Sequence, residues 1–131
     1  MNTKQFSTIG ICLALIAVIS MIAMPALVSA ETPASINHNR TQNCHCGKGS
    51  VTVSVTGYYD TSNPSTFTST SANWVVSGSV VKTSFTTVPA DTIIWAKFLG
   101  TCTYCGRTVE CIVWVSPPTF NPFAGDSGRC F

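Results

Sequence analysis

Charged side chains are scarce in this sequence. Lysine, arginine, aspartate and glutamate together make up 9% of the 131 residues, and the formal net charge at pH 7 is +2. A protein that binds nucleic acid needs clustered basic residues to neutralise the phosphates. Because lysine and arginine form no run or patch here, the composition argues against nucleic acid as a partner.

Side chains suited to catalysis are also few. The two histidines, His38 and His45, do not stand in a pattern with a nucleophile and a carboxylate. Asp60, Asp91 and Asp126 fall in turn-like segments, where aspartate commonly caps the local backbone. We therefore expect a non-catalytic protein without a cofactor.

The long apolar run of the chain lies near its N-terminus. It extends from Ile9 to Val28, follows Lys4 and ends before Ala30, which matches the cleavage pattern of secreted proteins. We expect residues 1–30 to be a signal peptide, with an uncleaved anchor as the alternative because the run approaches the ~20 residues that span a bilayer. Cleavage would leave a secreted or cell-surface protein without a membrane span.

The segment after the predicted signal peptide is polar. Residues 31–43 include Pro33 and show no hydrophobic periodicity, which predicts a flexible leader. The segment Asn39-Arg40-Thr41 is an N-glycosylation sequon in an exported chain. The folded domain is then expected to cover residues 44–131.

Strand patterns fill the expected domain. In residues 50–59, three valines alternate with serine and threonine, the period of a half-buried strand. Further short strands are predicted at residues 66–70, 73–77, 80–87, 92–99 and 108–115, whereas residues 116–131 are proline-rich and predicted to be irregular. No helical period follows residue 30, so we predict an all-β fold, a small antiparallel β-sandwich.

The number of strands and the spacing of turns resemble an immunoglobulin-like architecture. That family places a tyrosine two residues before its second cysteine, but Val109 stands at this position before Cys111. That family also places a tryptophan on the strand that follows its first cysteine, whereas Trp74 lies much farther along the chain from Cys46. The resemblance is therefore one of architecture and implies no particular ligand.

Six of the seven cysteines lie beyond the predicted signal peptide. They are Cys44, Cys46, Cys102, Cys105, Cys111 and Cys130. An even number in a small exported domain predicts three disulfides. We favour Cys111 with Cys130, and Cys44 and Cys46 with Cys102 and Cys105, because one intervening residue would strain a ring between Cys44 and Cys46.

A metal site is the alternative use of four of these cysteines. The segment Cys102-Thr103-Tyr104-Cys105-Gly106 has the C-x-x-C-G form, and Cys44-His45-Cys46-Gly47 is a possible partner with one residue between its cysteines. The two turns resemble the knuckles of zinc-ribbon and rubredoxin-like proteins. That resemblance implies tetrahedral zinc held by Cys44, Cys46, Cys102 and Cys105, or with His45 in place of one thiolate. Because export favours disulfides, we expect no metal.

One expected hairpin is apolar on both faces. Residues 92–99 and 108–115 place Trp95, Ile112 and Trp114 on one side of it, where aromatic rings can stack on sugars or anchor a protein. Burial of these residues by a second sheet or by the proline-rich tail is the alternative. We predict a domain that acts by binding a protein or carbohydrate surface or by assembly; a self-assembling structural subunit of an extracellular filament or envelope is a further alternative.

Overall fold

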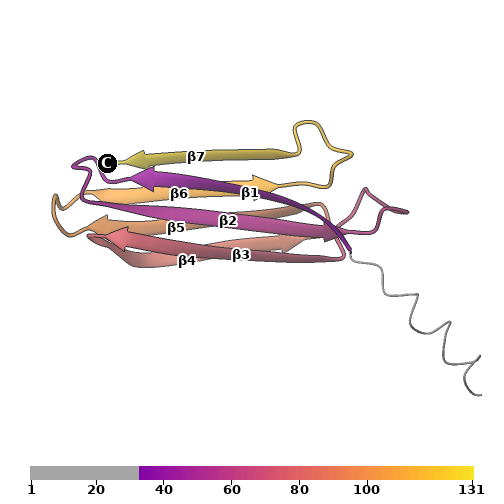
Figure 1. The fold of residues 1–131 in the computed structure, drawn as a ribbon, viewed down its shortest axis with the longest axis horizontal. Coiled ribbons are helices and arrows are strands. Elements are labelled where there is room, and N and C mark those ends of the chain that lie inside the picture. Colours follow the sequence, from indigo (N-terminus) through magenta and orange to yellow (C-terminus); the bar gives the residue numbers. More distant parts are fainter. Residues whose placement is uncertain (1–32) are drawn as a thin grey trace, which may run out of the picture. The chain divides into compact units, whose positions relative to one another are not determined.

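The structure is a computed structural model of the chain, and it describes residues 33–131 (Figure 1). The predicted signal peptide, residues 1–30, lies outside the described residues. Within residues 33–131, no helix is long and apolar enough to cross a bilayer.

Seven strands make up the described part of the chain. They are β1 (Ala34–Asn43), β2 (Gly49–Tyr59), β3 (Ser69–Gly78), β4 (Val80–Ala90), β5 (Ile93–Cys102), β6 (Thr108–Val115) and β7 (Ala124–Cys130). The first three strands form one antiparallel sheet and the other four form a second, each in sequence order. The two sheets lie face to face (Figure 1). The prediction of an all-β fold built from antiparallel sheets is confirmed.

The connectivity differs from that of immunoglobulin domains. In that family the two sheets exchange strands several times along the chain, whereas here each sheet consists of consecutive strands. The chain passes from one sheet to the other between β3 and β4, at Gly78 and Ser79. Gly78 has φ 67, and a Cβ there would lie 2.4 Å from the carbonyl oxygen of Lys48, so this crossing requires glycine.

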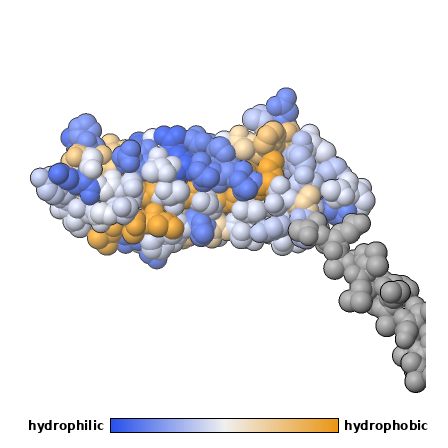
Figure 2. Space-filling view, in the orientation of Figure 1, coloured by the Kyte–Doolittle hydropathy of each residue, from blue (hydrophilic) through white to orange (hydrophobic). Residues whose placement is uncertain are grey.

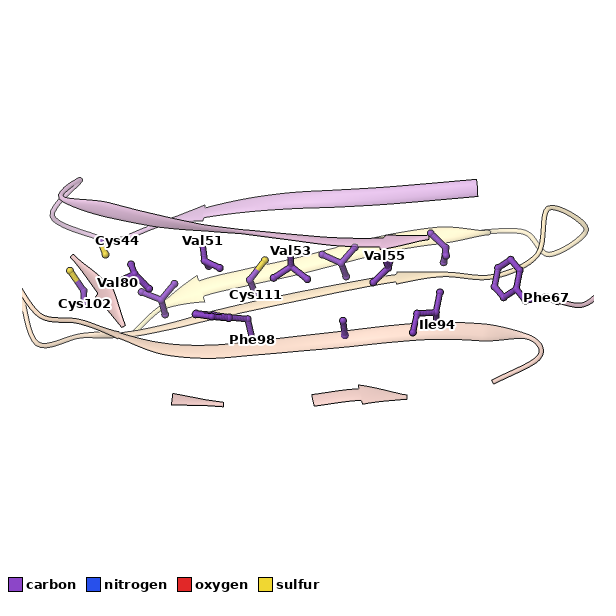
Figure 3. Packing of buried hydrophobic residues seen from close by; sticks show 14 residues of the cluster. Cys44, Val51, Val53, Val55, Phe67, Val80, Ile94, Phe98, Cys102 and Cys111 are labelled. Carbon is purple, nitrogen blue, oxygen red and sulfur yellow. The ribbon is translucent and has the colours of Figure 1, made fainter. Parts of the chain in front are cut away.

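The hydrophobic core fills the space between the sheets. Val51, Val53 and Val55 of β2 are fully buried, and they face Phe98 of β5 and neighbouring residues of β6 (Figure 3). The Trp74 ring, from β3, packs against that of Phe98 with a centroid distance of 5.5 Å. The valine alternation predicted for residues 50–59 therefore identifies the core face of β2 correctly.

The outer face of the three-stranded sheet is uncharged and polar. The residues that alternate with the inward positions of β1, β2 and β3 are all serine, threonine or asparagine, apart from Tyr58 and Val75. In Figure 2 hydrophilic residues predominate over β1, and the hydrophobic patches are separate from one another. Asn39, the sequon asparagine, is exposed on this face.

The prediction of a flexible leader over residues 31–43 is wrong for Ala34–Asn43. These ten residues form β1 and pair with β2 from end to end. Ile36, His38, Arg40 and Gln42 point inward and alternate with exposed residues. Because most of the inward side chains are polar, the two-residue period left no hydrophobic pattern. The described domain therefore starts at β1 and not at Cys44.

Residues 116–131 are also more regular than predicted. Ala124–Cys130 form β7, which pairs with β6. Its sequence, AGDSGRC, has neither the β-branched nor the aromatic residues that indicate a strand. The strand follows from pairing with β6, a tertiary contact that the local sequence does not encode.

Phe98→Ala should lower the free energy of unfolding by about 3–5 kcal/mol, because it opens a cavity between the sheets. Val75→Ala is the matched control, since Val75 is 64% exposed and surface truncations usually change stability by less than about 0.5 kcal/mol. Urea denaturation of the two variants measures the difference. Equal effects would contradict the assignment of Phe98 to the core.

Candidate functional site

Two turns at one end of the molecule carry the C-x-C and C-x-x-C segments. The first joins β1 to β2, and Gly47 N donates a 3.0 Å hydrogen bond to Cys44 O. The second joins β5 to β6, and Gly106 N donates a 2.7 Å hydrogen bond to Cys102 O. Both glycines have positive φ, 72 and 71, a conformation that favours glycine. Each turn therefore has a glycine N–H bonded to the carbonyl of its first cysteine, three residues later in the first turn and four residues later in the second.

The two turns bring their cysteines together. The Sγ atoms of Cys44, Cys46 and Cys102 lie within 4.8 Å of one another, and those of Cys46 and Cys102 are 3.6 Å apart. Cys105 lies on the same turn as Cys102, and its Sγ atom is not within 4.8 Å of all three. Cys44 and Cys102 are buried (Figure 3), whereas Cys46 and Cys105 are half-buried. We call these four residues the cysteine cluster.

The cysteine cluster favours one negative charge in its interior. The hydrogen bond from the Cys44 thiol, together with other donors, lowers the pKa of Cys102 to about 6. Burial, followed by the interactions with Cys102, raises the pKa of Cys44 to about 12. Backbone N–H groups of Cys105 and Lys48 donate to the sulfurs of Cys102 and Cys46. Thiolate is therefore stabilised on the buried sulfur of β5.

The structure does not show the predicted disulfides. All six cysteines of residues 33–131 are free thiols, and the 3.6 Å between Cys46 and Cys102 is well beyond a disulfide bond of about 2.05 Å. The Sγ atom of Cys111 is 3.6 Å from Arg40 O, and Cys130 Sγ accepts a hydrogen bond from His45 N at 3.2 Å. His45 itself is exposed and lies outside the group of close sulfur ligands.

The predicted aromatic surface lies on the outer face of the four-stranded sheet. Ile94, Ala96 and Phe98 point into the core, so the alternating residue Trp95 points outward. Trp95 stands opposite Trp114 in the register of β5 and β6, and Ile112 is opposite Lys97. All three predicted surface residues are half-buried. They share the sheet face that the three-stranded sheet does not cover, and we call them the tryptophan face.

Two features of neighbouring strands shape the tryptophan face. A Cβ on Gly125 of β7 would lie 2.6–2.7 Å from three indole atoms of Trp114, so the indole lies over the backbone of this glycine. Nearby, Glu110 is 3.2 Å from Lys97 Nζ and 2.9 Å from Arg129 Nε. Burial alone would raise the pKa of Glu110, but the hydrogen bonds from Arg129 and Lys97 outweigh it and lower that pKa.

A group of polar side chains that the sequence did not indicate joins β1 to β7. Asp126, expected in a turn, lies on β7 and accepts hydrogen bonds from Arg40 and from His38, the latter at 2.6 Å. These two contacts lower the pKa of Asp126. A Cβ on Gly128 would lie 2.4 Å from Gln42 Oε1, so the β1 side chains occupy the space above this glycine. Residues 34–43 gave no local signal for this group, because both alternating rows of β1 are mostly polar.

No family model matches the chain, and no curated protein or solved structure matches it either. The cysteine cluster and the tryptophan face are the two places in residues 33–131 whose geometry bears most directly on function.

Glu110→Gln should reduce the free energy of unfolding at pH 7 by about 1–2 kcal/mol, because it removes the charge that pairs with Lys97 and Arg129. The folded-state pKa of Glu110 is lowered, so its stabilisation is present above the unfolded pKa of about 4.3 and is lost as the pH falls through the folded pKa. Urea denaturation at pH 7 and pH 3 should show the variant and the parent converging at the lower pH.

Asp91→Asn is the control for the Glu110 measurement. Asp91 is exposed, and within residues 33–131 its carboxylate takes part in no ion pair. A pH-independent difference between Glu110→Gln and the parent would show that packing, and not charge, accounts for the loss.

Proposed function

We propose that this chain is a secreted or cell-surface domain that binds a carbohydrate surface through the tryptophan face, without catalysis. The observation that carries the proposal is the pair of outward tryptophans, Trp95 and Trp114, directly opposite each other on β5 and β6. Such a pair on an open sheet face offers a wide apolar platform at a small cost in side-chain entropy.

The position of Trp114 favours a flat ligand. Its indole lies over Gly125, so the β7 backbone supports the ring, and the half-buried side chain keeps part of its surface accessible. A sugar ring presents a flat apolar face of C–H groups, and aromatic rings pack well against such surfaces. Ile112, which precedes Trp114 by two residues on the same face, extends the platform along β6.

Few charges lie beside this face, and they are partly paired. The carboxylate of Glu110 pairs with both Lys97 and Arg129, which leaves one net positive charge among the three groups. A net charge of +2 over the whole chain adds little long-range attraction for a charged partner. We therefore expect polysaccharide binding to depend on stacking against the tryptophans more than on charge.

The proposal retains one of the predicted disulfides, the one between Cys111 and Cys130. Val109 is paired with Cys130 and Cys111 with Gly128, so the two cysteines are diagonal neighbours on the same side of β6 and β7. In an oxidising compartment, we propose that Cys111 and Cys130 form a disulfide that ties the last strand to the sheet.

Trp114→Ala and Trp95→Ala should each weaken binding to an insoluble neutral polysaccharide by about tenfold or more, because each removes one stacking surface. Depletion assays with cellulose, chitin and xylan measure the binding. Val75→Ala is the control, since Val75 is exposed on the outer face of the other sheet.

Thermal unfolding of the same variants separates the possible outcomes. Binding that is unchanged in both tryptophan variants would contradict the proposal. Self-association of the parent that Trp114→Ala abolishes, without polysaccharide binding, would instead identify the tryptophan face as an assembly interface. A collapse of the melting temperature would show that the rings are part of the core.

A further inference from the structure

We propose that the cysteine cluster is a zinc site, in which Cys44 and Cys46 of one turn and Cys102 and Cys105 of the other bind a single ion. The site would join the β1–β2 turn of one sheet to the β5–β6 turn of the other. It goes beyond the carbohydrate-binding proposal and depends on a different part of the molecule.

The spacing of the sulfurs distinguishes a metal site from a disulfide. Tetrahedral zinc with Zn–S bonds of about 2.3 Å places neighbouring sulfurs about 3.8 Å apart. The sulfurs of Cys46 and Cys102 are 3.6 Å apart, whereas a disulfide would need them about 1.5 Å closer. Cys44 Sγ completes a group of three within 4.8 Å, and the half-buried Cys105, on the same β5–β6 turn as Cys102, would supply the fourth thiolate.

The backbone of both turns is arranged to support thiolates. The N–H of Lys48 points to the sulfur of Cys46, and the N–H of Cys105 points to the sulfur of Cys102. Zinc would hold all four sulfurs as thiolates, the remaining thiol protons would be released to solvent, and the centre would have a net charge of about −2. Backbone N–H donors disperse such charge without adding another charged group.

A third turn connects the two cysteine turns. Ser79, at the crossing between the sheets, donates its N–H to Lys48 O at 3.0 Å, and its carbonyl accepts from Thr103 N at 2.8 Å. Lys48 Nζ also lies 5.6 Å from the centre of the Tyr104 ring. The two halves of the cluster are thus held in place by contacts that do not involve sulfur, so the ligands are arranged before an ion binds.

At the end of the hydrophobic core, a zinc ion would have a structural role. Cys44 and Cys102 are buried at the end of the core, next to Val80 (Figure 3). Their partners Cys46 and Cys105 are half-buried, which places the remaining two ligands toward the surface of that end. An ion bound to all four would cross-link the sheets where the core ends, and its binding free energy would add to folding stability.

The test begins with the full-length secreted protein as purified. Elemental analysis should find one zinc per chain, and alkylation after chelation should modify the four cysteines of the cluster. Replacement of zinc by Co²⁺ should give the intense visible absorption of a tetrahedral thiolate site. Disulfide bonds among these four cysteines in the native protein would overturn the proposal, whatever the reduced protein binds.

Single substitutions then test the ligand set. Cys46→Ser and Cys105→Ser should each weaken zinc binding by a factor of about 100 or more, because each removes one thiolate. His45→Ala is the control, since the exposed side chain of His45 lies in the same turn as Cys44 and Cys46 but outside the group of close ligands. Unchanged zinc affinity in both cluster variants would overturn the assignment of these ligands.

The Co²⁺ spectrum of the parent protein does not depend on whether a variant folds, so the proposal stays testable if a substitution prevents expression. Polysaccharide binding is measured through Trp95 and Trp114, at a separate surface. Failure of either proposal would therefore leave the other unaffected.

Discussion

The burial of alternate residues between the two sheets is the constraint on which the rest of the structure depends. Val53 and Phe98 are completely buried, and because side chains alternate along a strand, their burial fixes the direction of every neighbour. Trp95 must point away from the core for this reason. A shift of one residue in the β5 register would exchange the apolar core for the tryptophan face.

The same constraint divides the molecule into regions of different chemistry. One outer face is polar and uncharged and includes Asn39. The opposite outer face presents Trp95 and Trp114. The cysteine cluster lies at neither face but at one end of the core, where the turns of both sheets meet (Figure 3). Ligand binding and cross-linking of the sheets can therefore be separated by mutation.

The local sequence pattern was sufficient to predict a strand wherever that strand buries a row of apolar side chains. The valines of residues 50–59 predicted β2, and residues 92–99 and 108–115 lie within or close to β5 and β6. The local pattern did not predict β1 and β7, because their inward positions include polar residues and glycine. These two strands contact each other through His38 and Asp126. The convergence of Cys44, Cys46, Cys102 and Cys105 follows from the sheet topology, which no local pattern contains. The alternation of side chains along the strands showed which residues share the tryptophan face. Only the tertiary structure shows that the three-stranded sheet does not cover this face.

The two end strands of the domain have a mechanical consequence. β1 begins at one end of the long axis, whereas β7 ends at the other, and both run in the same direction (Figure 1). Tension applied between the two ends of the described chain would therefore slide β1 along β2 and β7 along β6. Because the inter-strand hydrogen bonds lie across the strands, such a load would act on all the bonds of each pair together instead of opening them one at a time. A domain anchored at one terminus and pulled at the other would resist extension in this geometry.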